Sequence, residues 1–246
     1  MKGGEHVRER LIFQHIPKTA GSAARAGLAQ LFSPQTVFLC GPDGVLDNLL
    51  TLPREKKDAI SFLSGHVDYG IHKIFSAPTV YAAFLRHPVE RVFSHWWHIF
   101  TRPEHRFHDF AQSTTLDGFL DAAIRPRMNN CMTRMLSGIN PPYGECPESM
   151  LKAALRNTTE SYCFLGTQER FDESYAMLAS LLGAEGDALK PPPERNLSEN
   201  RPRVEELPRE TRRRIERLNG LDIELYEKLK PRLPMVMTPR VVSRNW

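Results

Sequence analysis

A lysine, a glycine and two hydroxyl groups stand close together near the start of the chain, directly after an apolar run. The segment 11–22 reads LIFQHIPKTAGS. An apolar strand that runs into a tight turn and then a helix aims backbone N–H groups and the positive end of the helix dipole at one point. Gly21 lets the backbone approach a ligand closely, and Lys18 supplies a mobile cation. This chemistry suits a phosphate group.

The loop differs from the Walker A motif of metal-dependent phosphotransferases, which has the order G-x-x-x-x-G-K-[ST]. Lys18 precedes Gly21 here, and no strand ends in the apolar run plus Asp of a Walker B site. A kinase-like enzyme has to place Mg²⁺, and the sequence offers no evident residue for it. A strand, turn and helix with a chance lysine remains the alternative interpretation of this segment.

Residues 79–94 again place a candidate anion-binding residue directly after an apolar run. Arg86 follows an apolar run that ends at Leu85, and ligands of open α/β sheets bind at the carboxyl ends of strands. Ser94 lies two turns into the helix expected next, on a face that could turn back toward the same crevice. An arginine and a hydroxyl that converge there would form a second phosphate site, unless Arg86 is only a salt-bridged strand end.

The elements that would position these residues alternate between short β-rich runs and helical periods, which predicts a parallel sheet covered by helices. The predicted strands are Leu11–His15, Thr36–Cys40, Ile60–Ser64, Thr79–Leu85 and Tyr162–Gly166. The predicted helices are Ser22–Phe32, Pro88–Phe100, Glu169–Leu182 and one final helix over about 208–230. The predicted fold class is therefore α/β, with a central parallel sheet flanked by helices.

The remaining parts of the chain have weaker patterns. The part between about 101 and 157 is expected to be helical and irregular, and Pro191–Pro193 begin an extended stretch. We expect residues 1–246 to form a single domain with its core over about 10–230. For the tail, 231–246, the sequence predicts neither order nor disorder.

Together, the two phosphate segments resemble the donor-binding motifs of the sulfotransferases that use 3′-phosphoadenosine 5′-phosphosulfate (PAPS). In that family a H-x-P-K-T-x-[GS]-[ST] loop holds the 5′-phosphosulfate, and residues 15–22 match it. An R-[DH]-P-x-x-R-x-x-S segment holds the 3′-phosphate, and residues 86–94 match it, with His87 where Asp is frequent. The likeness is to a soluble, bacterial-type member of the carbohydrate branch, which includes heparan sulfate 2-O-sulfotransferase. It implies a P-loop-like three-layer fold.

The resemblance extends to less specific segments over most of residues 10–230. Residues 65–69 look like the G-H-x-x-Y stretch that carries a catalytic histidine in the 2-O-sulfotransferase, which gives His66 that role. Residues 130–134 look like a family N-x-Q-T-R stretch, with Met132 in place of Gln. Residues 196–201 resemble a loop that closes over the nucleotide.

The resemblance implies PAPS as the donor and an acceptor with a hydroxyl group, on a glycan or a small molecule. The implied donor-binding residues are Pro17, Lys18, Thr19, Ala20, Gly21, Ser22, Ala23, Arg86, Ser94, Asn196, Ser198 and Arg201. His66 would act as the base that removes the acceptor proton, and Lys18 would stabilise the bridging oxygen. We expect no metal, because sulfuryl carries fewer charges than phosphoryl. A hydrogen-bonded structural role is the other interpretation of His66.

Two histidine pairs could suggest a metal site, His95 with His98 and His105 with His108. Aromatic residues surround the first pair, and no Cys or acidic partner shares a ligand-like spacing. We therefore expect no metal there either. Two rival functions stay open beside sulfuryl transfer: a metal-dependent P-loop phosphotransferase and a non-catalytic module that binds a nucleotide or a glycan.

Composition narrows the class of protein. The 246 residues are 41% hydrophobic and 25% charged, as in an ordinary globular domain. No apolar run approaches the roughly 20 residues that cross a bilayer, and the start of the chain lacks the apolar stretch of a secretory signal. We expect a soluble, cytoplasmic protein without membrane insertion.

Residues 190–246 are basic, with 14 Lys or Arg against 9 Asp or Glu. This region could help hold an anion. It lacks the interleaved aromatic residues of a nucleic-acid site.

Overall fold

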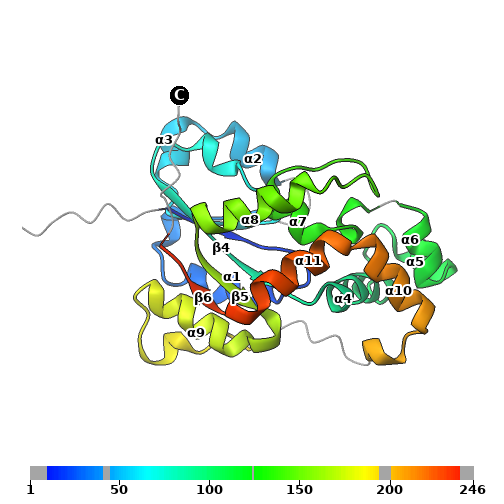
Figure 1. Cartoon of the computed structure of the whole chain (residues 1–246). Helices are drawn as coiled ribbons and strands as arrows, with labels where there is room; N and C mark the ends of the chain where they lie inside the picture. Colours follow the sequence, from blue (N-terminus) through cyan, green and yellow to red (C-terminus); the bar gives the residue numbers. More distant parts are fainter. Residues whose placement is uncertain (1–9, 41–44, 124, 194–200, 239–246) are drawn as a thin grey trace, which may run out of the picture.

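Six strands form one central sheet in the computed structural model (Figure 1), which describes residues 10–40, 45–123, 125–193 and 201–238. The strands are β1 Arg10–Gln14, β2 Val37–Leu39, β3 Phe62–Gly65, β4 Thr79–Leu85, β5 Tyr162–Thr167 and β6 Met235–Val236. Their order in the sheet is β2-β3-β1-β4-β5-β6, and every neighbouring pair is parallel except β5 and β6. The predicted α/β class with a central parallel sheet is confirmed, and β6 adds an antiparallel edge strand that was not predicted.

Helices cover both faces of this sheet. The described residues form α1 Gly21–Ala29, α2 Val45–Thr51, α3 Arg54–Asp58, α4 Pro88–Phe100, α5 His108–Ser113, α6 Leu116–Asp121, α7 Cys131–Ser137, α8 Ser149–Ser161, α9 Phe171–Leu181, α10 Arg209–Leu218 and α11 Gly220–Leu229. Along β1, Leu11 and Phe13 pack in a cluster with α1 and α9, whereas Ile12 packs in a cluster with α7, α8 and α11. These two clusters are the two interfaces of a three-layer fold, with the sheet in the middle.

The parallel strands are buried on both faces, which explains why they appear in the sequence as continuous apolar runs. Every residue of β1 and of β4 is buried. The register sets Gln14 of β1 beside Gly65 of β3 and Ala83 of β4. The three strands therefore end at one edge of the sheet, and the segments that follow them start near one another.

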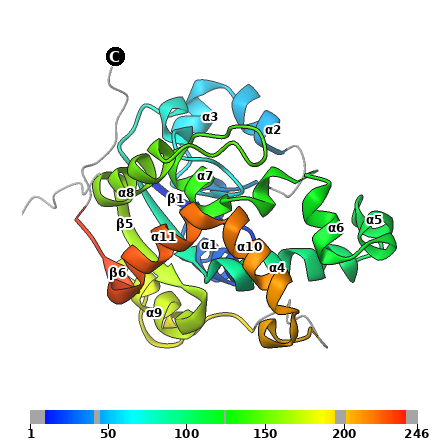
Figure 2. The same cartoon turned by 45° about the vertical axis from the view of Figure 1, so that its right-hand side comes forward.

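Four helices, α4, α5, α6 and α10, form a group beside the sheet, at the right in Figure 1; Figure 2 brings this side forward. A third cluster of buried side chains joins them, with Val92 and Phe93 from α4, Phe119 from α6 and Ile215 from α10. Pro88 occupies the first position of α4, where its missing N–H costs nothing. Because α4 begins shortly after β4 ends, this group of helices starts at the edge where the strand ends meet.

The prediction of a single final helix over about 208–230 is wrong. This segment forms two helices, α10 and α11, that meet at Asn219. The Asn219 side chain is fully buried; its Nδ2 donates to Met128 O and Ile215 O, and its Oδ1 accepts from Asn130 N. A buried amide requires such partners. The helix breaks at Asn219, where the amide side chain and the surrounding backbone groups form hydrogen bonds with each other.

The other predicted helices have the right positions but not all the right ends. α4 has its predicted bounds. α1 ends at Ala29 rather than Phe32, and α9 starts at Phe171 because Gln168–Arg170 form a 3₁₀ turn. In the tail, the described residues run to 238 and include β6. No helix within the described ranges is long and apolar enough to cross a membrane.

Candidate active site

The loop between β1 and α1 makes a tight turn around two residues with positive φ. Lys18 has φ 69° and Ala20 has φ 63°, both in the left-handed region that residues with a Cβ seldom adopt. Thr19 Oγ1 donates to Ile16 O at 2.9 Å and holds the turn from inside. Ala20, at the N-cap of α1, provides no side-chain acceptor for the first N–H groups of the helix. The predicted segment 17–23 therefore presents backbone donors that suit an anion.

Gly21, the first residue of α1, packs against the imidazole of His15. A Cβ atom at Gly21 would lie 2.1 Å from His15 Cδ2, closer than any Cβ contact can be. The His15 ring is buried, and its centre lies 4.5 Å from the centre of the His66 ring. The sequence predicts close approach of a ligand at Gly21. The structure adds a second reason, because only glycine leaves room for this histidine beside the loop.

Lys18 lies in a strongly positive environment. The pKa of its ammonium group is lowered to about 8, first by burial and then by the positive charges of Arg86, Arg102 and Arg201. Cations gathered in this way repel one another unless a negative charge lies among them. The Glu90 carboxylate pairs with Arg86 and Arg201, and an anionic ligand would bring a further negative charge beside Lys18, so the surroundings of Lys18 suit a phosphate or sulfate group.

Arg86 joins the second predicted anion site to the first. Its Nη1 donates to Lys18 O at 3.2 Å, and its Nη2 donates to Glu90 Oε2 at 2.9 Å. Arg201 Nη2 donates to the same carboxylate oxygen, also at 2.9 Å. Arg86 Nε and Arg201 Nη1 are buried and have no hydrogen-bond partner among the described residues. Arg86 is thus salt-bridged, as the alternative interpretation expected, yet it keeps a donor for a phosphate oxygen.

Arg201 and Ser94 both belong to the surroundings of α4. The Arg201 guanidinium lies 5.4 Å from the centre of the Phe93 ring, a cation–π contact that holds it against this helix. Ser94 is buried and follows Glu90 by one helical turn on the same face. Asn196 and Ser198, which were predicted for the loop before Arg201, lie outside the described residues.

His66 directly follows β3 and meets the loop that follows β1. Its Nδ1 lies 2.6 Å from His15 O; a carbonyl oxygen only accepts, so Nδ1 carries the proton and Nε2 carries the lone pair. The pKa of His66 is lowered to about 4, mainly by burial. The hydrogen bond to His15 raises this pKa, whereas the positive charges of nearby arginines lower it further. The imidazole is therefore neutral at pH 7 and can accept a proton at Nε2.

Gln14 fixes the segment after β3 from within the sheet, a role that the sequence did not indicate. This fully buried amide donates from Nε2 to Val67 O at 2.9 Å and to Met135 O at 2.8 Å. Tyr162 O–H donates to Gln14 Oε1 at 2.7 Å. A buried amide with all of these partners is rigid, and it places the residue after His66 relative to β1. The only signal in the sequence was a polar residue at the end of an apolar strand.

The stretch 130–134, which resembles the family N-x-Q-T-R stretch, belongs to the core. Met132 and Thr133 are buried at the start of α7, and their N–H groups donate to the carboxylate of Asp222 at 3.0 and 2.7 Å. Arg134 is 1% exposed and donates to Asn129 O, just before the helix, and to Asn140 Oδ1 and Pro142 O in the loop after it. These contacts tie α7 to α11, which makes the stretch a structural one.

The histidines of α4 and α5 lie among aromatic and basic side chains. His95 is buried, and its Nε2 lies 3.3 Å from Arg125 Nη2. The ring of Trp96 lies 4.8 Å from Phe100 and 6.0 Å from Phe93 between centres. Within the part of the chain that the structure describes, no group of three or more His, Cys, Asp or Glu could hold a metal ion.

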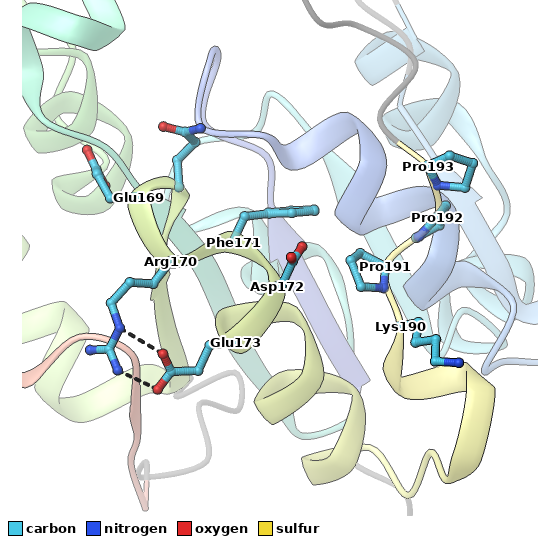
Figure 3. Close-up of a pocket in the computed structure, with 10 residues that line it drawn as sticks. Glu169, Arg170, Phe171, Asp172, Glu173, Lys190, Pro191, Pro192 and Pro193 are labelled. Atoms are coloured by element: carbon cyan, nitrogen blue, oxygen red, sulfur yellow. Dashed lines mark hydrogen bonds and ion pairs between the residues drawn. The ribbon is translucent and has the colours of Figure 1, made fainter.

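A cavity of about 840 Å³ opens between the start of α9 and the proline segment 191–193 (Figure 3). It is lined by Gln168, Glu169, Arg170, Phe171, Asp172, Glu173, Lys190, Pro191, Pro192 and Pro193. Figure 3 shows Phe171 and Asp172 on the side of the prolines, whereas Arg170 and Glu173 pair with each other and point away.

The cavity adjoins the turn that carries Arg86. Glu169, which lines the cavity, accepts a hydrogen bond at 2.7 Å from the backbone N–H of His87. On the other side, Pro192 packs against α1, where a Cβ atom at Gly27 would lie 2.8 Å from the proline ring. A ligand in this cavity would therefore lie between the start of α9 and the proline segment, which packs against α1, and close to the turn that carries Arg86.

The chain matches a known protein family over most of its length. A family model described as the sulfotransferase family covers residues 6–228. A search of curated proteins found no match. The matched range includes the loop after β1, the Arg86 turn and the segment after β3, so it contains every described part of the site.

Proposed function

Because the chain belongs to the sulfotransferase family, we propose that it transfers a sulfuryl group from PAPS to a hydroxyl group of an acceptor. One observation supports PAPS above all: Arg86 Nη1 donates to Lys18 O at 3.2 Å, so two separate anion-binding elements are in direct contact. PAPS carries negative charge at its 5′ and its 3′ position, and it needs both elements. ATP carries its charge on the 5′ side alone.

In this proposal the donor lies along the edge where β1, β3 and β4 end. The N–H groups of residues 17–23 and the Lys18 ammonium bind the 5′-phosphosulfate. Arg86 and Arg201 bind the 3′-phosphate with the donors that have no partner among the described residues. Ser94 adds a hydroxyl from α4.

The cavity beside α9 is the proposed place of the adenosine (Figure 3). Phe171 offers an aromatic ring there, and the proline segment forms the opposite wall. The hydrogen bond between Glu169 and the His87 N–H keeps this cavity next to the proposed 3′-phosphate site. Asn196 and Ser198 follow the proline segment in the sequence, and they remain proposed donor-binding residues.

His66 is the proposed general base. Its Nε2 lone pair takes the proton of the acceptor hydroxyl while the acceptor oxygen forms a bond to sulfur. The bond between sulfur and the bridging oxygen of the donor breaks, and this oxygen leaves with the electron pair. Lys18 stabilises the charge that develops there. The products are a sulfate ester and 3′-phosphoadenosine 5′-phosphate (PAP).

The acceptor and the place of action complete the proposal. We propose a hydroxyl-bearing glycan or small molecule as the acceptor, a cytoplasmic location, and no metal in the transfer step. A sulfuryl group carries less charge than a phosphoryl group. Lys18 and the backbone donors therefore suffice to stabilise the charge in the transfer step, without a metal.

The protein is expected to bind PAP much more tightly than ATP, and without a need for Mg²⁺. The reason is the pair of anion sites, of which ATP can fill only one. Isothermal titration calorimetry with each nucleotide, with Mg²⁺ and with EDTA, measures this difference. Equal affinity for ATP or a strict need for Mg²⁺ would favour a metal-dependent phosphotransferase. PAP binding without any sulfated product from radiolabelled PAPS, over a panel of acceptors, would favour a non-catalytic binding module.

Replacing Arg86 with Ala should weaken PAP binding by about 1.5–3 kcal/mol, the usual cost of a lost charge-assisted contact, or roughly 10- to 150-fold in Kd. We expect a smaller effect on kcat, because Arg86 contacts the donor away from the reacting sulfur. A matched control is Arg217→Ala, which removes an exposed arginine that donates to Glu210 at 3.0 Å. Normal PAP affinity in Arg86→Ala would place the 3′-phosphate elsewhere.

A further inference from the structure

Arg127 holds the backbone of His66, although it belongs to none of the segments that pointed to a function. It lies in the 3₁₀ helix Pro126–Met128, between α6 and α7. Its Nη2 donates to His66 O at 3.0 Å and lies 3.8 Å from Asp68 Oδ1. The guanidinium thus contacts the segment after β3 at two points on either side of Val67.

The fully buried Arg91 of α4 holds Arg127 in turn. Its Nη2 donates to Arg127 O at 3.0 Å. Arg91 is the second arginine of the segment 86–94, and its side chain is fully buried. α4 also carries Ser94 and follows Arg86 directly. A continuous chain of hydrogen bonds therefore runs from the helix of the proposed 3′-phosphate site through Arg127 to His66.

We propose that Arg127 is a positioning residue, which fixes the His66 segment against α4 so that the imidazole Nε2 stays aligned with the donor. The proposal rests on the function proposed above, in which His66 is the base. Without the Arg127 contact, the His66 carbonyl loses a partly buried donor, and the imidazole is held mainly by its own bond to His15 O. A misplacement of about 1 Å in such a group can cost about 10²-fold in rate.

The chemistry of arginine suits this role better than that of lysine. A guanidinium is a planar group with five donors in a fixed geometry, so it can hold a carbonyl and approach a carboxylate at once. The pair with Asp68 is partly exposed, and such pairs contribute little stability on their own. The hydrogen bond to His66 O is therefore the contact whose loss should matter.

The charge of Arg127 gives the test a second readout. The charged or titratable groups around His66 are His15 from the loop after β1, Arg25 from α1, Arg125 and Arg127 from the segment before α7, and Asp68 from its own segment. Burial lowers the pKa of His66 most, and the positive charge of Arg127 lowers it further. Removal of that charge should raise the pKa of His66, and the acid limb of the kcat profile should move to higher pH.

The experiment compares Arg127→Met and Arg127→Lys with wild type. We expect Arg127→Met to lower kcat by about 10²-fold, with PAP affinity unchanged and the acid limb at higher pH. Arg127→Lys keeps the charge, so its acid limb should stay near that of wild type while kcat falls about 10-fold. Arg125→Met is the control: it removes a neighbouring positive charge whose guanidinium contacts His95 and which also lowers the pKa of His66. Its acid limb should also move to higher pH, but kcat should stay close to that of wild type.

Wild-type kcat in Arg127→Met would overturn the proposal, as would a lower kcat whose acid limb does not move. If Arg127→Met does not fold, Arg127→Lys decides, and wild-type kcat in that variant overturns the proposal. Titration of the His66 imidazole by NMR gives a readout that needs no turnover. An unchanged His66 pKa in Arg127→Met would count against the contact between Arg127 and His66. This result does not depend on the identity of the donor, so it tests the positioning role of Arg127 separately from the proposed transfer from PAPS.

Discussion

Replacing His66 with Asn is expected to lower the transfer rate by about 10²–10⁴-fold and to leave PAP affinity nearly unchanged. The imidazole Nδ1 donates to His15 O at 2.6 Å, so its Nε2 is the atom that can take a proton. An asparagine amide can donate to the same carbonyl and preserve this contact. It cannot take a proton at neutral pH, so the variant removes the proposed base and little else.

Single-turnover kinetics with PAPS, together with calorimetry for PAP, separate the chemical step from donor binding. A matched control is His108→Asn, because His108 also approaches a backbone carbonyl, Ile99 O at 3.3 Å, but lies on α5. A wild-type rate in His66→Asn would move the base elsewhere, with Asp68 as the next candidate. Loss of folding would instead favour the structural interpretation of this histidine.

Two elements have the bounds that the sequence predicted, and both are marked by the residues at their ends. β4 and α4 have the predicted bounds, Thr79–Leu85 and Pro88–Phe100. β4 is buried on both faces, which gives an uninterrupted apolar run, and Pro88 marks the start of the helix. Local composition was sufficient in these cases, because each element is bounded by residues that stop or start it.

The elements that the sequence did not predict depend on distant contacts. β6 has two residues, and it is defined by its pairing with β5. The break between α10 and α11 depends on Asn219, whose amide reaches Met128 and Asn130, about 90 residues away. A pattern read along the chain shows an almost continuous helical period there. The contacts that interrupt it exist only in the folded protein.

The same distinction holds for the candidate site. Lys18, Arg86 and His66 each follow a buried parallel strand, so the common edge of the sheet brings them near one another. Arg127 and Gln14 have no such marker, because their contacts with the His66 segment cross 61 and 53 residues. Side chains that hold others in place are recognised by their partners, and partners are visible only in three dimensions.

Replacing Lys18 with Met is expected to lower kcat by about 10²–10³-fold, the usual effect of removing one group that stabilises charge in the transition state. Methionine keeps most of the length and the apolar stem of the side chain, so the tight turn should persist. The donor should also bind more weakly, since Lys18 contributes positive charge to the 5′ site. The control is Lys152→Met, which removes an exposed lysine 4.0 Å from Glu148 Oε1 on α8.

The pH profile of kcat/KM for PAPS tells Lys18 from His66, because it reports the groups that titrate in the free enzyme. The pKa of Lys18 is lowered to about 8, so the wild-type enzyme loses this positive charge as the pH rises through that value, and kcat/KM should fall above about pH 8. His66 gains a proton below about pH 4 and should set the acid limb. Lys18→Met should lose the alkaline limb and keep the acid one, whereas His66→Asn should keep the alkaline limb alone. An alkaline limb that persists unchanged in Lys18→Met would mean that another group provides the charge at the 5′ site.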